Sequence, residues 1–127
     1  MSHILLVDDD SITNFLNKKI VLKSGMATSI KAFTSGTEAL EYLNKIIEGN
    51  AQDPFPDFIL LDIMMPVMDG FEVLDELMKL PAEHTGELNV FMLSSSLDQR
   101  DHERALRYPL VKDFISKPLT VENVRDF

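Results

Sequence analysis

The amino-acid sequence predicts an α/β fold in which a five-stranded parallel sheet lies between two layers of helices. Two observations support this prediction. Short apolar runs recur five times along the chain, and each is followed by a segment with helical spacing of its apolar residues. The chain has 127 residues, of which 45% are hydrophobic, and this suffices for one domain with its own core. Because right-handed crossovers join parallel strands, the helices should cover both faces of the sheet and form a three-layer sandwich.

Strands are expected where apolar residues run together. The runs that begin near His3, Phe58 and Asn89 are the most apolar, as strands buried on both faces require. The second and fifth runs also carry polar residues. The expected strands span residues 3–8, 27–33, 58–62, 89–94 and 112–116.

A first helix is expected directly after the first strand. Ser11 can accept a hydrogen bond from an N–H group of the first turn, and Gly25 supplies the left-handed residue that ends many helices. Apolar residues at helical spacing define the face that should be buried: Ile12, Phe15, Leu16 and Ile20.

A second helix should follow the second strand. Ser35 and Glu38 have the spacing of a capping box, in which each side chain binds the other residue's backbone N–H. Gly49 and Asn50 should end this helix and begin a surface loop over residues 49–57. The apolar face of the helix is expected to contain Ala39, Leu40, Leu43 and Ile47.

Shorter helical segments complete the alternation. One should run from Phe71 to just before Pro81, because a residue that precedes proline disfavours helix. The next, over residues 98–107, is rich in charge, and Thr120 can cap a short last helix that ends near Phe127. The expected apolar anchors of the first two segments are Leu74, Leu77 and Met78, and Leu97, Ala105 and Leu106.

Carboxylates gather at the predicted carboxyl ends of two strands, where ligands of such sheets bind. Asp8, Asp9 and Asp10 follow the first strand, and Asp62 ends the third. At about 4 Å and an effective dielectric near 20, each pair of like charges costs roughly 4 kcal/mol. The cluster therefore needs a cation or protonation to relieve it. Asp10 is expected to face outward without a ligand role.

The composition excludes several classes of function. The formal net charge of −9 opposes unaided binding to nucleic acid or anionic lipid, because phosphates would be repelled. No segment reaches the roughly 18 uncharged apolar residues of a membrane span, and the N-terminus is too acidic for a signal peptide. The chain has no cysteine, which excludes disulfides, thiol nucleophiles and thiolate metal sites. A cytoplasmic protein without direct nucleic-acid or membrane partners is expected.

Several short motifs follow one another over nearly the whole chain, and together they resemble those of the response-regulator receiver domain of two-component signalling. The motifs are Val7-Asp8-Asp9, Leu61-Asp62, Met65-Pro66, Met68-Asp69-Gly70, Ser94-Ser95 and Lys117-Pro118. The resemblance implies a flavodoxin-like sheet with strand order 2-1-3-4-5. It also implies one receiver domain over residues 1–127, acting alone without an output domain, as a chemotaxis regulator does.

What the resemblance implies for Asp62 is the role of phosphoacceptor. It would take a phosphoryl group from a phosphohistidine on a sensor histidine kinase or a phosphotransfer protein, as a nucleophile that forms an acyl phosphate. Lys117 would pair first with Asp62 and then with the phosphoryl oxygens, while Ser94 would donate a hydrogen bond to the phosphoryl group. The downstream partner is unknown.

The resemblance also implies a Mg²⁺ site. Asp9 and Asp62 would bind the ion directly together with the backbone carbonyl of Met64, and Asp8 would act mainly through a coordinated water. Hard oxygen ligands with retained waters suit this ion. Methionines usually fill the core, but Met64, Met65 and Met68, which follow Asp62, could instead form an apolar surface for a partner.

Receiver domains switch when a hydroxyl at the position of Ser94 moves toward the phosphate and an aromatic residue on the fifth strand turns inward. That aromatic would here be Phe114, which lacks a phenolic hydroxyl; it could equally be simple core. The peptide bond between Lys117 and Pro118 is expected to be cis. Gly70 is expected to have a positive φ before the third helix. The chain departs from the family pattern at Ser94, where threonine is commoner, and over residues 108–111, where a pair of small residues is usual.

Two other functions remain open. In a phosphatase that resembles the haloacid dehalogenase group, Asp8 would be the nucleophile and Asp10 the general acid. That interpretation leaves Asp62 unexplained. It also requires an acidic pair after Lys117 to hold Mg²⁺, and Glu122 and Asp126 are the acidic residues that follow Lys117. The third function is an inert scaffold with the receiver shape, which would have no need for the site residues that this chain retains.

Overall fold

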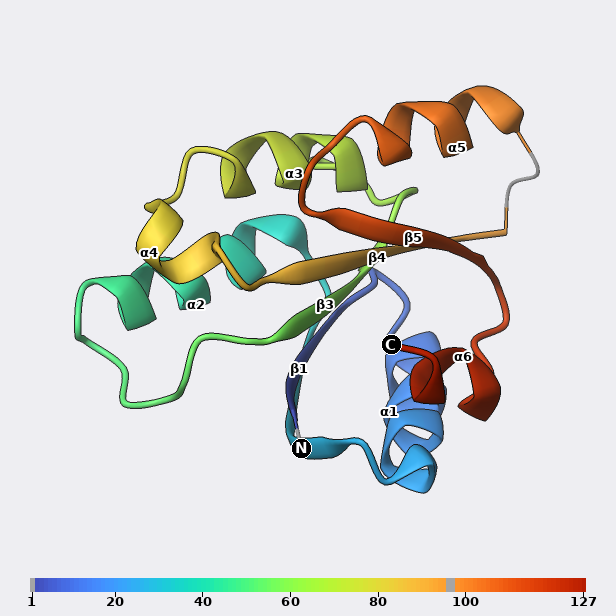
Figure 1. Cartoon of the computed structure of the whole chain (residues 1–127), viewed down its shortest axis with the longest axis horizontal. Coiled ribbons are helices and arrows are strands. Elements are labelled where there is room, and N and C mark those ends of the chain that lie inside the picture. The colour runs from blue at the N-terminus through green and yellow to red at the C-terminus, as the bar shows by residue number, and fades with distance from the viewer. Residues whose placement is uncertain (1, 96–97) are drawn as a thin grey trace.

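The computed structural model describes residues 2–95 and 98–127, and it contains one five-stranded sheet (Figure 1). Every neighbouring pair of strands is parallel, and their order is β2-β1-β3-β4-β5, which confirms the expected fold class. The strands are β1 (Ser2–Val7), β2 (Ala27–Phe33), β3 (Phe58–Asp62), β4 (Asn89–Ser94) and β5 (Val111–Ser116). Their bounds differ from the predicted ones by at most one residue.

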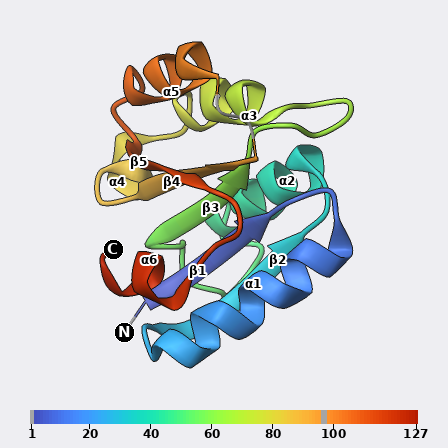
Figure 2. The same ribbon diagram turned by 90° about the vertical axis from the view of Figure 1, so that its right-hand side faces the viewer.

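Helices cover both faces of the sheet, so the three-layer arrangement is also confirmed. They are α1 (Ser11–Ser24), α2 (Gly36–Ile47), α3 (Gly70–Leu77), α4 (Ala82–Thr85), α5 (Gln99–Leu106) and α6 (Val121–Arg125). Figure 2 shows α1 and α6 together on one side of the sheet and α2, α3 and α5 on the other. The single turn of α4 was not predicted. No helix within the described residues is long and apolar enough to cross a membrane.

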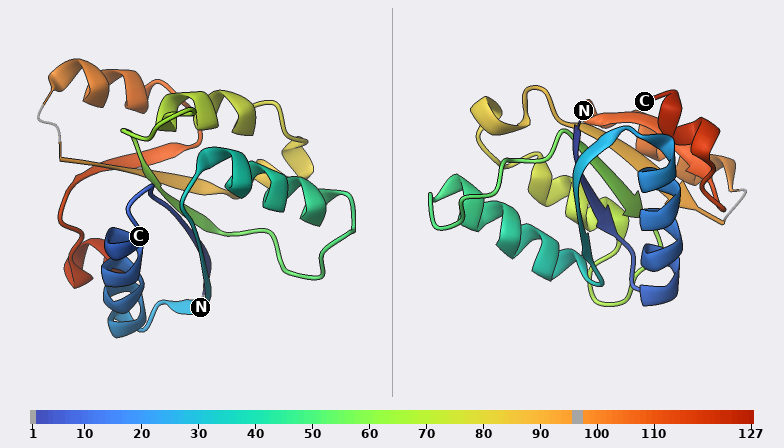
Figure 3. Two further views of the ribbon diagram at one scale, coloured as in Figure 1. Left: turned by 180° about the vertical axis from the view of Figure 1, so that it is seen from behind. Right: turned by 90° about the horizontal axis from the view of Figure 1, so that it is seen from below.

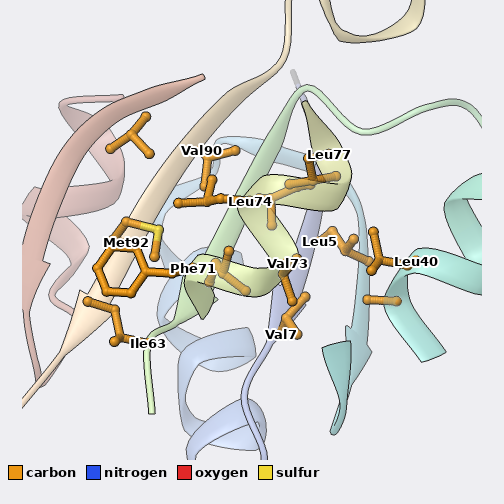
Figure 4. Packing of buried hydrophobic residues seen from close by; sticks show 14 of the residues in the cluster. Leu5, Val7, Leu40, Ile63, Phe71, Val73, Leu74, Leu77, Val90 and Met92 are labelled. Carbon is orange, nitrogen blue, oxygen red and sulfur yellow. The ribbon is translucent and has the colours of Figure 1, made fainter. Parts of the chain in front are cut away.

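Alternation along the strands divides the core into two clusters. In β1, Ile4 and Leu6 pack with α1 and α6, whereas Leu5 and Val7 face α2 and α3. Figure 4 shows the larger cluster, in which Phe71, Val73, Leu74 and Leu77 of α3 point onto the sheet. Each fully buried leucine of this kind stabilises the fold by about 1.5–3 kcal/mol relative to an exposed one. β1, β3 and β4 are therefore apolar on both faces, as predicted, whereas β2 and β5 at the edges of the sheet are largely exposed.

The buried face of α1 differs from the prediction. Ile12, Phe15 and Leu16 are 68%, 57% and 54% exposed. Of the predicted face, Ile20 is partly buried and packs against the smaller core cluster. The buried side chains of α1 are instead Asn14, Asn17, Val21 and Ser24. The reason is that hydrogen bonds satisfy the donor groups of two of these side chains: Asn14 and Ser24 both donate to backbone carbonyls. Hydrophobic spacing alone could not reveal this, because apolar residues occur on both sides of the helix.

The start of α1 also differs in detail. Asp10, not Ser11, is the N-cap, and its Oδ1 accepts a hydrogen bond of 2.9 Å from the N–H of Ile12. Asp10 is exposed, as expected, but has this capping role. At the other end Gly25 has a φ of 75°, which confirms the predicted left-handed stop.

The remaining caps follow the predictions in part. Ser35 caps α2 by accepting a 3.1 Å hydrogen bond from the N–H of Glu38, which is one of the two hydrogen bonds of the expected capping box. Thr120 caps α6 in a capping box with Asn123. Figure 3 shows the connection from α2 to β3 as a long surface loop, as expected for residues 49–57.

Gly70 does not have a positive φ, so the expected reason for a glycine there was wrong. Its neighbours give the actual reason: a Cβ at this position would lie 2.6 Å from the backbone oxygen of Asp62 and 2.9 Å from Cα of Ile63. The positive φ in this loop occurs at Val67, with a value of 67°, and that side chain is 96% exposed. Close approach to the strand, not turn geometry, therefore requires Gly70.

Some expected helix anchors lie outside the core. Met78 is 45% exposed because α3 has already ended at Leu77, and Leu106 is 49% exposed at the end of α5. Ala105 is fully buried, as predicted. Leu97 lies outside the described residues.

Candidate functional site

The register of the sheet brings the predicted site residues to one edge. Val7 of β1 pairs with Leu61 of β3, so the residues that follow them, Asp8 and Asp62, are neighbours. Because all strands are parallel, this edge carries every carboxyl end.

The same edge continues across β4 and β5. Ser94 pairs with Ser116, and the next residue is Lys117, whose N–H donates to the carbonyl of Ser94 at 2.9 Å. The peptide bond from Lys117 to Pro118 is cis, as expected. The sheet thus delivers an ammonium group and a hydroxyl group beside the carboxylates.

Three carboxylates form a compact group. Asp8, Asp9 and Asp62 each offer one oxygen, and these atoms lie within 4.8 Å of one another. Asp8 and Asp62 are buried, at 2% and 4% exposure, whereas Asp9 is exposed. Asp10 is absent from this group, because its carboxylate caps α1. The group is therefore open to solvent on the side of Asp9.

Lys117 bridges the two buried carboxylates. Its Nζ lies 2.8 Å from Oδ2 of Asp8 and 3.0 Å from Oδ1 of Asp62. The side chain of Lys117 is 23% exposed. One cation thus faces three carboxylates, so the cluster retains a net negative charge.

This imbalance affects the protonation of Asp62. Burial raises the pKa of its carboxyl group to about 6; the hydrogen bond and charge of Lys117 oppose this, while the charges of Asp8 and Asp9 add to it. Burial also lowers the pKa of Lys117, but its hydrogen bonds to Asp8 and Asp62 outweigh that effect and the pKa is raised. Lys117 therefore stays charged at neutral pH. Its positive charge does not fully offset burial and the neighbouring carboxylates, which raise the pKa of Asp62.

The donor set fits a hard divalent cation. Carboxylate oxygens are the ligands that Mg²⁺ prefers, and the ion keeps several waters, which the exposed side of the group allows. Because a carboxylate has two oxygens, Asp62 can contact Lys117 through Oδ1 and another group through Oδ2. The three carboxylates lie close enough together to hold such an ion.

The other predicted site residues lie on β4, on β5 and in the loop after β3. Ser94 is 1% exposed at the end of β4. Met64 is 71% exposed in the loop after Asp62. Phe114 of β5 is partly buried, and its ring stacks on that of His102 of α5, with centroids 4.9 Å apart and planes 13° apart.

A surface groove adjoins the site. It has a volume of about 470 Å³ and lies between α1 and the segment after β5; its lining includes Thr13, Leu16, Ile20, Lys117, Pro118 and Leu119. We call it the α1 groove. Lys117 belongs to both the groove and the acidic cluster, so the two are continuous.

One residue beside the cluster was not anticipated from the sequence. The side chain of Asn14 donates a 3.0 Å hydrogen bond to the backbone carbonyl of Asp8. Its sequence signal is a polar residue one turn into α1, four positions after the capping Asp10.

Comparisons with known proteins agree with this geometry. A family model described as the response regulator receiver domain matches residues 4–127. A two-component response regulator from Cytophaga hutchinsonii has a similar crystal structure, with a TM-score of 0.88 and 35% identity; the match covers 98% of this chain and 91% of that one. The chemotaxis protein CheY of Bacillus subtilis is 29% identical over 125 residues, which cover 98% of this chain and 92% of CheY.

Other relatives are longer. A probable cyclic di-GMP phosphodiesterase of Vibrio cholerae is 34% identical over 119 residues, which make up 92% of this chain but only 24% of that protein. The shared part is therefore one module that occurs in proteins of very different length.

Proposed function

This chain belongs to the response regulator receiver family, and from this premise we propose that Asp62 accepts a phosphoryl group from a phosphohistidine of a partner protein. The observation that carries the proposal is the position of Asp62. It lies beside two further carboxylates and in contact with the ammonium group of Lys117. The similarity to CheY over most of both chains supports a single receiver unit that acts through protein contacts.

The proposed reaction is a transfer between two proteins. A carboxylate oxygen of Asp62 attacks phosphorus, an O–P bond forms, and the N–P bond to the donor imidazole breaks. The imidazole nitrogen keeps the bonding electron pair and is neutralised by a proton. The product is an acyl phosphate on Asp62, which water can later hydrolyse. The module has no other chemistry in this proposal.

Phosphoryl transfer depends mainly on the positioning of the reacting groups and on neutralisation of their charge. Lys117 already lies 3.0 Å from Asp62 and would move its contact to the phosphoryl oxygens. Ser94 would donate its hydroxyl hydrogen bond to the same group. With a pKa of about 6, Asp62 is largely ionised at neutral pH and so is competent as a nucleophile.

Mg²⁺ would be held by Asp9 and Asp62, with the backbone carbonyl of Met64 as a further ligand and Asp8 acting through a water. When bound, the ion supplies positive charge that the three carboxylates lack and that a phosphoryl group requires. Its ligands come from the ends of β1 and β3, so the sheet register sets their spacing.

The partner would dock on α1. Ile12, Phe15 and Leu16 are exposed in the first half of this helix, and Leu16 lines the α1 groove together with Lys117. Helix α1 carries three lysines and no acidic residue, in a chain whose net charge is −9. These features fit an apolar helix flanked by carboxylates on the donor protein. A second copy of this chain, docked symmetrically through α1, would oppose lysine to lysine.

Phosphorylation would change the conformation of β5 and α5. Movement of Ser94 toward the phosphoryl group would open space into which Phe114 turns, and this would release its stack on His102. The surface around α5 would then present a different shape to a downstream protein.

The test is phosphorylation by acetyl phosphate, a small donor that needs no docking surface. With Mg²⁺ present, the intact mass should rise by one phosphoryl group, and EDTA should prevent this. The variant Asp62→Asn should take up no label, whereas Asp10→Asn, which alters only a helix cap, should still be labelled. Labelling of Asp62→Asn would contradict the proposal.

The same experiment addresses the phosphatase alternative, in which Asp8 is the nucleophile and Asp10 the acid. The exposed, capping position of Asp10 does not support that role, and neither do Glu122 and Asp126, which are both exposed at the C-terminal helix. A stable label that survives in Asp62→Asn and is lost in Asp8→Asn would favour the phosphatase.

A further inference from the structure

Asn14 contacts the loop of Asp8, Asp9 and Asp10 between β1 and α1, which we call the acidic loop. The proposed reaction assigns Asn14 no role. It is 5% exposed and lies near the start of α1. Its Nδ2 donates two hydrogen bonds of 3.0 Å, one to the backbone carbonyl of Asp8 and one to that of Phe33. The carbonyl of Phe33 also accepts from the N–H of Asp8, at 3.1 Å. One amide therefore joins the ends of β1 and β2 at the point where the acidic loop begins.

The backbone of Asn14 fixes the other end of this loop. Its N–H donates to the carbonyl of Asp10 at 3.1 Å, while the N–H of Asp10 donates to Oδ1 of Asp8 at 2.9 Å. Asn14 thus binds the carbonyls on both sides of Asp9. The backbone around this exposed carboxylate is held before any cation arrives.

The orientation of the Asn14 amide follows from its partners. Two carbonyl oxygens can be bonded only by the NH₂ group, so Oδ1 must point the other way. There it is the buried side-chain polar atom without a hydrogen-bond partner within the residues that the structure describes. An unsatisfied buried acceptor costs stability. Asparagine at this position is thus a poor choice for stability alone, and the geometry of the loop explains it better.

We infer that Asn14 is a positioning residue, which holds Asp8 and Asp9 in the arrangement that binds a divalent cation. The inference rests on the proposed function, because the cation belongs to that site. Groups that orient metal ligands through hydrogen bonds typically change metal affinity by roughly 10- to 100-fold when they are removed.

The experiment measures Mn²⁺, a divalent ion visible by electron paramagnetic resonance, without any phosphodonor. Asn14→Leu keeps the branched shape and the number of heavy atoms but removes both donors and the unpaired oxygen; Asn14→Ala is a second variant that avoids a branched side chain. The matched control is Asn17→Leu. Asn17 is the same residue type on the same helix, 7% exposed, but it lines the α1 groove, not the acidic loop.

Both Asn14 variants should raise the Kd for Mn²⁺ by roughly 10- to 100-fold, while Asn17→Leu should bind like the wild type. In EDTA the Tm of Asn14→Leu should lie close to that of the wild type, because removal of the unpaired oxygen offsets the loss of the amide donor to the carbonyl of Asp8. Amide exchange at Asp10 should be faster in Asn14→Ala, also in EDTA, because the loop is released.

The inference is overturned if folded Asn14→Leu or Asn14→Ala binds Mn²⁺ as tightly as the wild type. It is also overturned if metal affinity falls only in proportion to Tm, equally in the Asn14 and Asn17 variants. Failure of the proposed function looks different: a wild-type chain that binds Mn²⁺ but takes no phosphoryl group from acetyl phosphate contradicts that function and leaves the result on Asn14 standing.

Discussion

Burial and charge oppose each other at Asp62. The carboxyl group is 4% exposed, and burial is the main cause that raises its pKa from 3.8 to about 6. The folded state therefore holds this proton more tightly than the unfolded state between about pH 4 and pH 6. As a result, the free energy of unfolding falls as the pH rises through this window. Ionised Asp62 destabilises the metal-free fold at neutral pH.

This predicts that Asp62→Asn stabilises the protein in EDTA. A shift of about two pKa units corresponds to about 2–3 kcal/mol, which the neutral side chain should recover at pH 7.5. The gain should shrink toward zero as the pH falls from 6 to 4, because Asp62 of the wild type then becomes protonated too. Urea denaturation of both proteins across this pH range measures it. A constant difference in stability from pH 4 to pH 8 would show that ionisation is not the cause.

At Val67 the backbone conformation conflicts with the type of side chain. A β-branched side chain at a φ of 67° is strained, and this one gains nothing from burial, since it is 96% exposed. It lies in the loop between Asp62 and Asp69, beside the exposed Met64. Sequence patterns could not locate the strain, because they predicted the positive φ at Gly70.

At the scale of one element, α1 has separate roles on its two sides. Its inner side binds the sheet through Val21 and holds the acidic loop through Asn14. Its outer side leaves Phe15 and Leu16 exposed beside the α1 groove. Exposed apolar residues on a helix with polar buried residues are difficult to explain by stability, and the proposed docking of a donor protein would account for them.

We therefore predict that Phe15→Ser and Leu16→Ser together separate docking from chemistry. Stability should change by no more than about 0.5 kcal/mol per substitution, as is usual for surface positions. Labelling by acetyl phosphate should be unchanged, whereas the rate of transfer from a phosphorylated histidine phosphotransfer protein should fall at least about tenfold, a loss of 1.4 kcal/mol in transition-state binding.

The matched control for this prediction is Leu22→Ser on the same helix. Leu22 is 58% exposed but lies near the far end of α1, roughly 10 Å along the axis from Phe15. This variant should keep the wild-type rate with both donors. An equal loss of transfer in both kinds of variant would mean that α1 is not the docking element.

Helix α5 has few apolar contacts with the sheet, which suits an element that moves. Ala105 is its buried residue. Ring and polar contacts supply the rest: Arg104 lies over the ring of Phe71, and the hydroxyl of Tyr108, just after α5, donates to Asp75 at 2.7 Å. Such contacts can be exchanged at lower cost than a buried apolar face.

Beryllofluoride with Mg²⁺, as a mimic of the phosphorylated state, should therefore alter α5 and Phe114. The ring resonances of Phe114 and His102 should shift, because their stack at 4.9 Å is lost when Phe114 turns inward. Phe127 provides an internal control, since its ring stacks on Phe91 in the cluster beneath α1 and α6. Resonances of Phe114 that do not change at saturation would contradict the switch.

For the whole molecule, apolar runs placed all five strands, whereas the strand order and the clustered groups followed from the family resemblance. With that order, the common carboxyl edge of the parallel strands brings Asp8, Asp62 and Lys117 together. Features that depend on orientation within an element were not predictable. The buried side of α1, the cap at Asp10 and the close contact at Gly70 each depend on backbone groups of another segment.

The charge of the whole molecule complicates any test of the metal site. With a net charge of −9, an added simple salt such as NaCl screens repulsion between the charges and so favours the fold. A specific site adds a further term that depends on ligand concentration: at 100 times its Kd, Mg²⁺ should raise the free energy of unfolding by about 2.7 kcal/mol. For a domain of this size the Tm should rise by on the order of 10 °C.

The last prediction separates these two effects. Calorimetry of the wild type in Mg²⁺ and in NaCl of equal ionic strength should show a large excess in Tm for Mg²⁺. Asp9→Asn should remove this excess and keep the response to NaCl, because Asp9 is the exposed carboxylate of the cluster and its loss leaves the core intact. Equal shifts in the two salts, or an excess that survives in Asp9→Asn, would mean that the stabilisation is screening and that the three carboxylates do not bind the ion together.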